Sequence, residues 1–112
     1  MEHTDVLANK KFDEKDAVTV VTIKTNQMTQ ATYYLLPGQT LPWHRHPDGD
    51  QIFFTHEGAG VCSIDSGNGE ESVRLAPGVI ALAPKGVGHR IEATERLIVS
   101  AATAQPAGFE KR

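Results

Sequence analysis

Residues 38–58 read GQTLPWHRHPDGDQIFFTHEG, and this stretch decides the fold. Glycine stands at both ends, a histidine pair lies inside it at His44 and His46, and Gln51 follows five residues later. Side chains at positions i and i+2 of a strand project from the same face, about 7 Å apart, so two imidazoles in this arrangement can approach one cation. The stretch therefore predicts a strand that carries two nitrogen ligands and a second strand that begins with an amide.

A second stretch, residues 78–93, reads GVIALAPKGVGHRIEA and carries a third histidine, His89. It has the same punctuation by glycine and proline as the first stretch, which is typical of tight turns between short strands. We expect the two stretches to bring four donors to one divalent metal ion: His44, His46, Gln51 and His89.

The glycine, histidine and proline framework of the two stretches resembles the two short motifs of the cupin family. Eight framework positions match, and the resemblance covers residues 38–58 and 78–93, about a third of the chain. It implies an all-β double-stranded β-helix, the jelly-roll barrel, with a metal site inside. It also implies a homodimer, because small cupins commonly dimerise.

Two positions depart from the family pattern. Gln51 stands where the first motif usually has glutamate, and Ala93 stands where the second usually has asparagine. Three neutral imidazoles and one neutral amide leave a divalent ion its full charge, which favours Lewis-acid chemistry over oxygen activation. Asp50 is a rival ligand at a spacing one residue shorter, and Gly49 could permit the bulge that this needs. Strand parity favours Gln51 over Asp50, and we expect neither His3 nor His56 to be a ligand.

The rest of the chain alternates with a period of two and is broken by turn residues at short intervals, which is typical of a small all-β protein. We expect a single domain over residues 1–112, in which residues 1–12 are a flexible N-terminal extension and residues 3–9 are the only helical candidate. The expected strands are 17–25, 28–36, 40–46, 51–55, 61–65, 72–75, 79–83, 88–93 and 96–103.

Strand parity also predicts what surrounds the site. If Gln51 points inward, Phe53 does as well, and Thr40 and Pro42 share the inner face with the histidine pair. Consecutive residues alternate, so one of Tyr33 and Tyr34 faces the pocket. Both tyrosines are catalytic candidates, since a phenol there could move a proton to or from a ligand.

Composition excludes several classes of protein. The formal net charge is −3 and the basic residues are scattered, which argues against binding to nucleic acid. No apolar run is long enough for a membrane span or a signal peptide, so we expect a cytoplasmic protein. Cys62 is the only cysteine, which excludes an intrachain disulfide. Residues 17–25 are apolar on both faces, which favours a homodimer that covers one of them.

These observations predict a metal-dependent enzyme that acts on a small anionic or carbonyl-bearing metabolite, of the isomerase, cyclase or lyase type. The alternatives are a metal-dependent dioxygenase and a non-enzymatic module that binds a small ligand or a metal. Imidazole and amide ligands leave the metal open among Zn, Fe, Mn, Ni and Cu. The fold supports many chemistries, so the site must decide between them.

Overall fold

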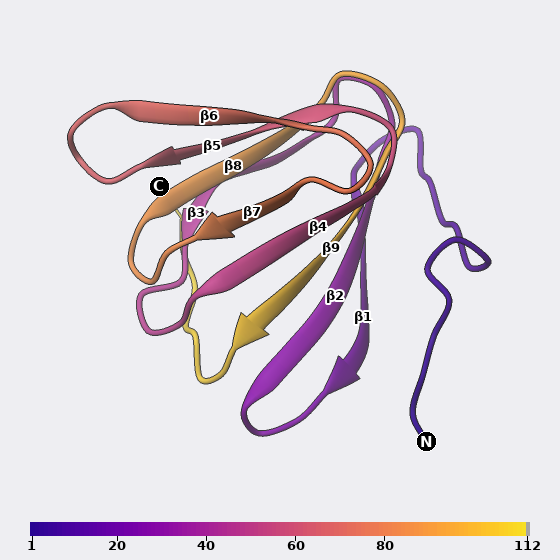
Figure 1. Cartoon of the computed structure of the whole chain (residues 1–112), viewed down its shortest axis with the longest axis horizontal. Helices are drawn as coiled ribbons and strands as arrows, with labels where there is room; N and C mark the ends of the chain where they lie inside the picture. The colour runs from indigo at the N-terminus through magenta and orange to yellow at the C-terminus, as the bar shows by residue number, and fades with distance from the viewer. Residues whose placement is uncertain (112) are drawn as a thin grey trace.

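The protein is described by a computed structural model that covers residues 1–111, and it consists of two five-stranded antiparallel sheets (Figure 1). The strands are β1 (Val18–Lys24), β2 (Met28–Leu35), β3 (Thr40–Arg45), β4 (Gln51–Glu57), β5 (Gly60–Asp65), β6 (Glu70–Leu75), β7 (Ile80–Ala83), β8 (Gly88–Ala93), β9 (Leu97–Ala104) and β10 (Glu110–Lys111). The first sheet has the order β1-β2-β9-β4-β7, and the second has the order β10-β3-β8-β5-β6.

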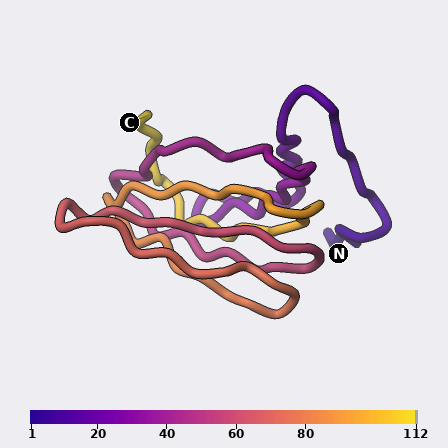
Figure 2. Tube along the Cα trace, turned by 90° about the horizontal axis from the view of Figure 1, so that it is seen from above, coloured from indigo at the N-terminus to yellow at the C-terminus, as the bar shows by residue number. Residues whose placement is uncertain are grey.

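The chain crosses repeatedly between the two sheets, so strands that are distant in sequence lie side by side. In the first sheet β9 lies between β2 and β4, and in the second β8 lies between β3 and β5 (Figures 1 and 2). This is the all-β jelly roll that the sequence predicted. Residues 6–9 form a turn, so the helix considered for residues 3–9 is wrong. No segment of the described chain is a helix that could cross a membrane.

The core fills the space between the inner faces of the sheets. It is formed by small and medium apolar side chains from both layers, which bury their surface against each other. Its fully buried members include Leu35, Phe53, Leu75, Ile91, Leu97 and Val99. The phase of β4 is as predicted, because Gln51, Phe53 and Thr55 are all buried.

The prediction that Thr40 and Pro42 of β3 share the inner face with the histidines is wrong for Pro42. The pairing of β3 with β8 shifts register between Leu41 and His44. As a result Leu41 packs against the core and Pro42 is exposed. An irregularity of this kind adds residues to one strand and reverses the faces on either side of it.

The segment before β1 lies against the outer face of the first sheet. The Tyr34 hydroxyl donates a hydrogen bond to the carbonyl of Val6 at 2.8 Å, and the ring of Phe12 packs edge-on against Tyr34 at 5.6 Å. Arg96 lies over the other ring of this pair, 5.3 Å from the centre of Phe12. The first sheet is therefore covered on both faces around β2, by the core inside and by this segment outside.

Candidate metal centre

Two neighbouring strands of the second sheet deliver the three predicted histidines to one point. His44 lies in β3, His46 follows directly after this strand, and His89 lies in β8. His44 and His89 are paired across the two strands, and their ring centres are 4.2 Å apart. The three histidines each offer one ring nitrogen, and these atoms lie within 4.8 Å of one another. The predicted convergence of the histidines is confirmed, and this triad could hold a metal ion.

Each imidazole is oriented by a backbone carbonyl that accepts a hydrogen bond from its Nδ1. The pairs are His44 with Pro42 at 2.8 Å, His46 with Gly108 at 2.8 Å, and His89 with Val87 at 3.3 Å. A carbonyl can only accept, so each Nδ1 carries the proton and each Nε2 has a free lone pair. This tautomer and this outer support are what a ring needs to bind a metal through Nε2.

Three of the predicted ligands each have one buried polar atom without a hydrogen-bond partner. These atoms are Nε2 of His46, Nε2 of His89 and Oε1 of Gln51. His89 and Gln51 are only 1% and 2% exposed, so water does not compensate these atoms freely. An unsatisfied buried acceptor costs about 1–3 kcal/mol, and native proteins rarely keep several together without a purpose. All three atoms carry lone pairs, and a bound cation is one kind of group that accepts them.

Gln51 is the first residue of β4 and belongs to the first sheet. Its Nε2 donates a hydrogen bond of 2.8 Å to the buried hydroxyl of Thr103 on β9, which fixes the amide and leaves Oε1 without a partner. Asp50, the rival ligand, is exposed, and its carboxylate accepts a hydrogen bond of 2.8 Å from the backbone N–H of Lys85. Of the two candidates, Gln51 is the buried residue with an unpartnered oxygen.

Burial favours the neutral form of two of the histidines. It lowers the pKa of His89 to about 4, and the neighbouring His44 adds to this effect. Burial also lowers the pKa of His44. A metal ligand must have lost its proton, so imidazoles with lowered pKa values can bind a cation over a wider range of pH than exposed ones.

The two tyrosines point to opposite sides of the first sheet. Tyr33 lines a cavity of ≈ 460 Å³ together with His44, His46 and Phe109. Burial raises the pKa of the Tyr33 phenol, and the adjacent Gln51 side chain acts in the opposite direction. Tyr34 lies on the outer face, where its hydroxyl is bonded to Val6. Of the two catalytic candidates, the structure brings only Tyr33 to the site.

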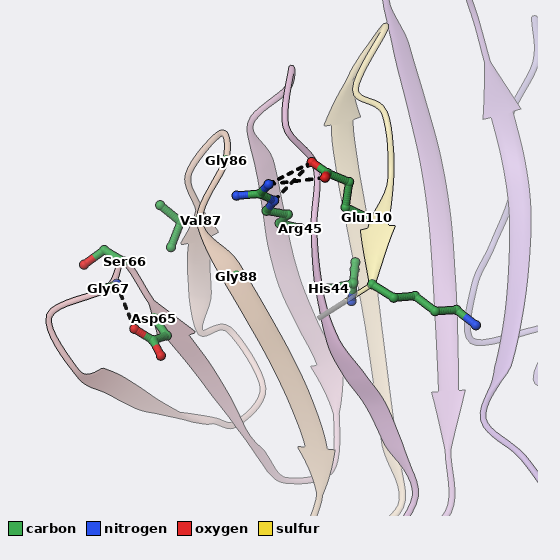
Figure 3. A pocket seen from close by; sticks show the side chains of 10 residues that line it. His44, Arg45, Asp65, Ser66, Gly67, Gly86, Val87, Gly88 and Glu110 are labelled. Carbon is green, nitrogen blue, oxygen red and sulfur yellow. Dashed lines mark hydrogen bonds and ion pairs between the residues drawn. The ribbon is translucent and has the colours of Figure 1, made fainter.

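Sequence reasoning missed the contribution of the C-terminal residues. The ring of Phe109 stacks on His44 with a centre distance of 5.2 Å, and the carbonyl of Gly108 supports His46. Both lie beyond the two motifs, and nothing in their local sequence indicated a role. Another hollow of ≈ 440 Å³ is lined by His44, by Gly88 at the start of β8 and by the ion pair of Arg45 with Glu110 (Figure 3).

The chain was compared with protein families and with known proteins. Residues 31–101 match the cupin domain family. No curated protein matches the chain.

Several solved structures resemble the whole chain. TT1209 from Thermus thermophilus is 26% identical, with a TM-score of 0.84, and the match covers 93% of this chain and 97% of that one. An uncharacterized conserved protein with a double-stranded β-helix domain from Klebsiella pneumoniae is 25% identical, with a TM-score of 0.82 and coverage of 96% and 94%. KdgF from Halomonas sp. is 22% identical, with a TM-score of 0.73 and coverage of 84% of each chain, a likeness that shows the fold alone.

Proposed function

Because the chain belongs to the cupin family, we propose that it binds one divalent metal ion through His44, His46, His89 and Gln51. The observation that carries this proposal is the set of unpartnered, buried lone pairs on His46, His89 and Gln51. Each of these side chains is held by a hydrogen bond on its other polar atom, so the donors are oriented before the ion arrives. Prior orientation of this kind reduces the cost of binding.

The chemistry proposed for the site is that of a Lewis acid. All four donors are neutral, and the buried residues of the described chain include no carboxylate. A divalent ion held in this way keeps its double charge and polarises the oxygen of an anionic or carbonyl-bearing ligand. We therefore favour isomerisation, cyclisation or elimination on a small metabolite over chemistry that needs a higher oxidation state of the metal.

Tyr33 is the proposed proton-transferring group. It lines the cavity beside His44 and His46, and burial raises the pKa of its phenol, so the phenol is protonated at neutral pH and can donate to a ligand oxygen. Leu41 and Phe109 provide apolar walls in the same cavity and limit the access of water to a ligand beside the tyrosine.

A binding module without turnover is the second candidate. The observation that favours it is again the lack of a buried carboxylate among the described residues, because a strong general base is then missing. Once a ligand is identified, turnover and ligand affinity measured in the wild type and in Tyr33→Phe distinguish an enzyme from a binding module. An enzyme loses turnover and keeps ligand affinity, whereas a binding module has no turnover to lose.

The primary test is the metal content of protein purified without an affinity tag. We expect about one equivalent of a divalent ion per chain, either as purified or after incubation with Zn²⁺, Mn²⁺, Fe²⁺, Ni²⁺ or Cu²⁺ in turn. Protein that takes up none of these ions would contradict the metal site. Consumption of oxygen with an organic ligand by the iron-loaded protein would contradict the Lewis-acid assignment and support a dioxygenase.

A further inference from the structure

The C-terminal segment, defined as residues 105–111, returns from the end of β9 to the metal centre. It pairs as β10 with β3, where Glu110 lies opposite Arg45 and Lys111 lies opposite His44. An ion pair of 3.0 Å joins Arg45 to Glu110 (Figure 3). This segment lies outside residues 31–101, which the cupin domain family matches.

Gly108 makes a contact that its backbone conformation determines. Its carbonyl accepts the hydrogen bond of 2.8 Å from Nδ1 of His46. Its φ is +71°, and a Cβ at this position would lie 3.0 Å from Cγ of Pro47. Glycine alone adopts this φ without strain, and the crowding by Pro47 adds a second restriction. The residue that directs the carbonyl toward His46 is thus constrained to be glycine.

We propose that the C-terminal segment is part of the metal centre and that Gly108 is the positioning residue for His46. The inference rests on the proposed metal-binding function. With the carbonyl in place, His46 keeps its proton on Nδ1 and offers Nε2 to the ion. Loss of an outer hydrogen bond of this kind typically lowers metal affinity about 10- to 100-fold.

The test compares Gly108→Ala with Gly78→Ala. Gly78 also has a positive φ, of +93°, but no atom would lie within 4 Å of its added Cβ, so this control introduces backbone strain without touching a ligand. We expect Gly108→Ala to bind Zn²⁺ about 10- to 100-fold more weakly in competition with a chelator, and Gly78→Ala to bind like the wild type. Gly108→Asn should lie between them, because asparagine tolerates positive φ better than alanine.

A second readout needs no metal. The ring ¹⁵N spectrum of the metal-free wild type should show the Nδ1–H tautomer of His46, and in Gly108→Ala this preference should weaken. Equal Zn²⁺ affinities in the Gly108 and Gly78 variants, or an unchanged tautomer, would overturn the inference. A wild type that binds none of Zn²⁺, Mn²⁺, Fe²⁺, Ni²⁺ and Cu²⁺ would instead overturn the proposed function, so the two failures are distinguishable. If Gly108→Ala does not fold, the Zn²⁺ affinity and the His46 tautomer of Gly108→Asn are compared with those of the Gly78 variant instead.

A different observation concerns the ligand. The ring of Phe109 stacks on His44, yet the residue is 59% exposed, so much of its surface is open to a ligand. The same cavity is lined by Tyr33 and Trp43, and Lys111 brings a positive charge to it. Flat apolar walls favour a flat ligand, and the cation favours an anionic one. From this we infer that the cavity accepts a planar, ring-bearing carboxylate, and that Phe109 determines the preference for planarity.

Benzoate and cyclohexanecarboxylate test this inference, because they share charge and size and differ in planarity. With Zn²⁺-loaded protein, we expect benzoate to bind about two- to tenfold more tightly. Phe109→Leu should remove the difference. Phe54→Leu should retain it, since Phe54 is also an exposed phenylalanine but lies in a separate hollow on the outer face. Equal binding of the two acids by wild type, or a preference that survives Phe109→Leu, would overturn the role of Phe109.

Discussion

The histidines inside the barrel and His56 on the outer face of the first sheet have opposite hydrogen-bonding states. The Nε2 atoms of His46 and His89 are buried without a partner, whereas Nε2 of His56 lies 2.7 Å from the hydroxyl of Ser100. The hydroxyl of Ser100 is in turn hydrogen-bonded to the hydroxyl of Thr32, at 3.0 Å. Nε2 of His56 is therefore paired within the protein, whereas the lone pairs of the inner rings need a group that the described residues do not supply.

The difference shows which property of a histidine indicates a metal ligand. All of these side chains are in β-strands or directly beside one, so secondary structure does not distinguish them. What distinguishes them is that the inner rings are fixed through Nδ1 by backbone carbonyls and are left unpaired at Nε2. A ring that is fixed on one side and unpaired on the other is prepared for a ligand.

The largest expected effect comes from removing one histidine of each region. His46→Ala should abolish stoichiometric metal binding, because it deletes one of the four proposed donors, and His56→Ala should leave the metal content unchanged. Metal analysis of both proteins after dialysis against Zn²⁺ measures this. Full occupancy in His46→Ala, or a loss in His56→Ala, would reverse the assignment of the two regions.

A smaller effect is expected from pH in the metal-free protein. The pKa of His89 is about 4 in the folded state, below its ordinary value of 6.5. The unfolded chain therefore binds more protons between these two pH values, and the free energy of unfolding should fall as the pH is lowered through this window. The contribution of His89 to this decrease is at most about 3 kcal/mol.

Urea denaturation at about pH 7 and about pH 4.5 measures that decrease, with His89→Gln as the comparison because glutamine does not titrate. The difference between the two pH values should be larger in the wild type than in the variant. If both proteins lose the same amount of stability, His89 does not titrate as its burial implies.

The smallest expected effect belongs to the outer cluster. Ser100→Ala removes the hydroxyl between His56 and Thr32, and Ser100 is only 5% exposed. The cost should be about 1–2 kcal/mol of unfolding free energy, since a buried network loses its central member. Zn²⁺ affinity should not change. A change in Zn²⁺ affinity would show that the two faces of the first sheet are coupled. It would contradict the view that the inner histidines are independent of the cluster around His56.

The sequence predicted most of the fold because its alternation and turn residues are local signals. The inward phase of Gln51 and Phe53 was predicted correctly from a period of two, and the convergence of the histidines was predicted correctly from the framework of the two stretches. The period of two gave the wrong face for Pro42, because the register of β3 shifts where it pairs with β8. That pairing is between distant segments, so the local sequence does not indicate it.

Other features could not be predicted for the same physical reason. The choice between Tyr33 and Tyr34 depends on which face of β2 meets the core, and the support of His46 by Gly108 depends on a segment 62 residues away in the chain. Both depend on tertiary structure. The homodimer and the cytoplasmic location stay predictions.

The four proposed donors are divided unequally between the two sheets. Three imidazoles come from the second sheet or from the turn after β3, and the amide of Gln51 comes from the first. An ion bound to all four would link the two sheets directly, in addition to the packing of the core between them. Gain or loss of that ion would thus alter the mechanical stiffness of the whole barrel as well as its chemistry.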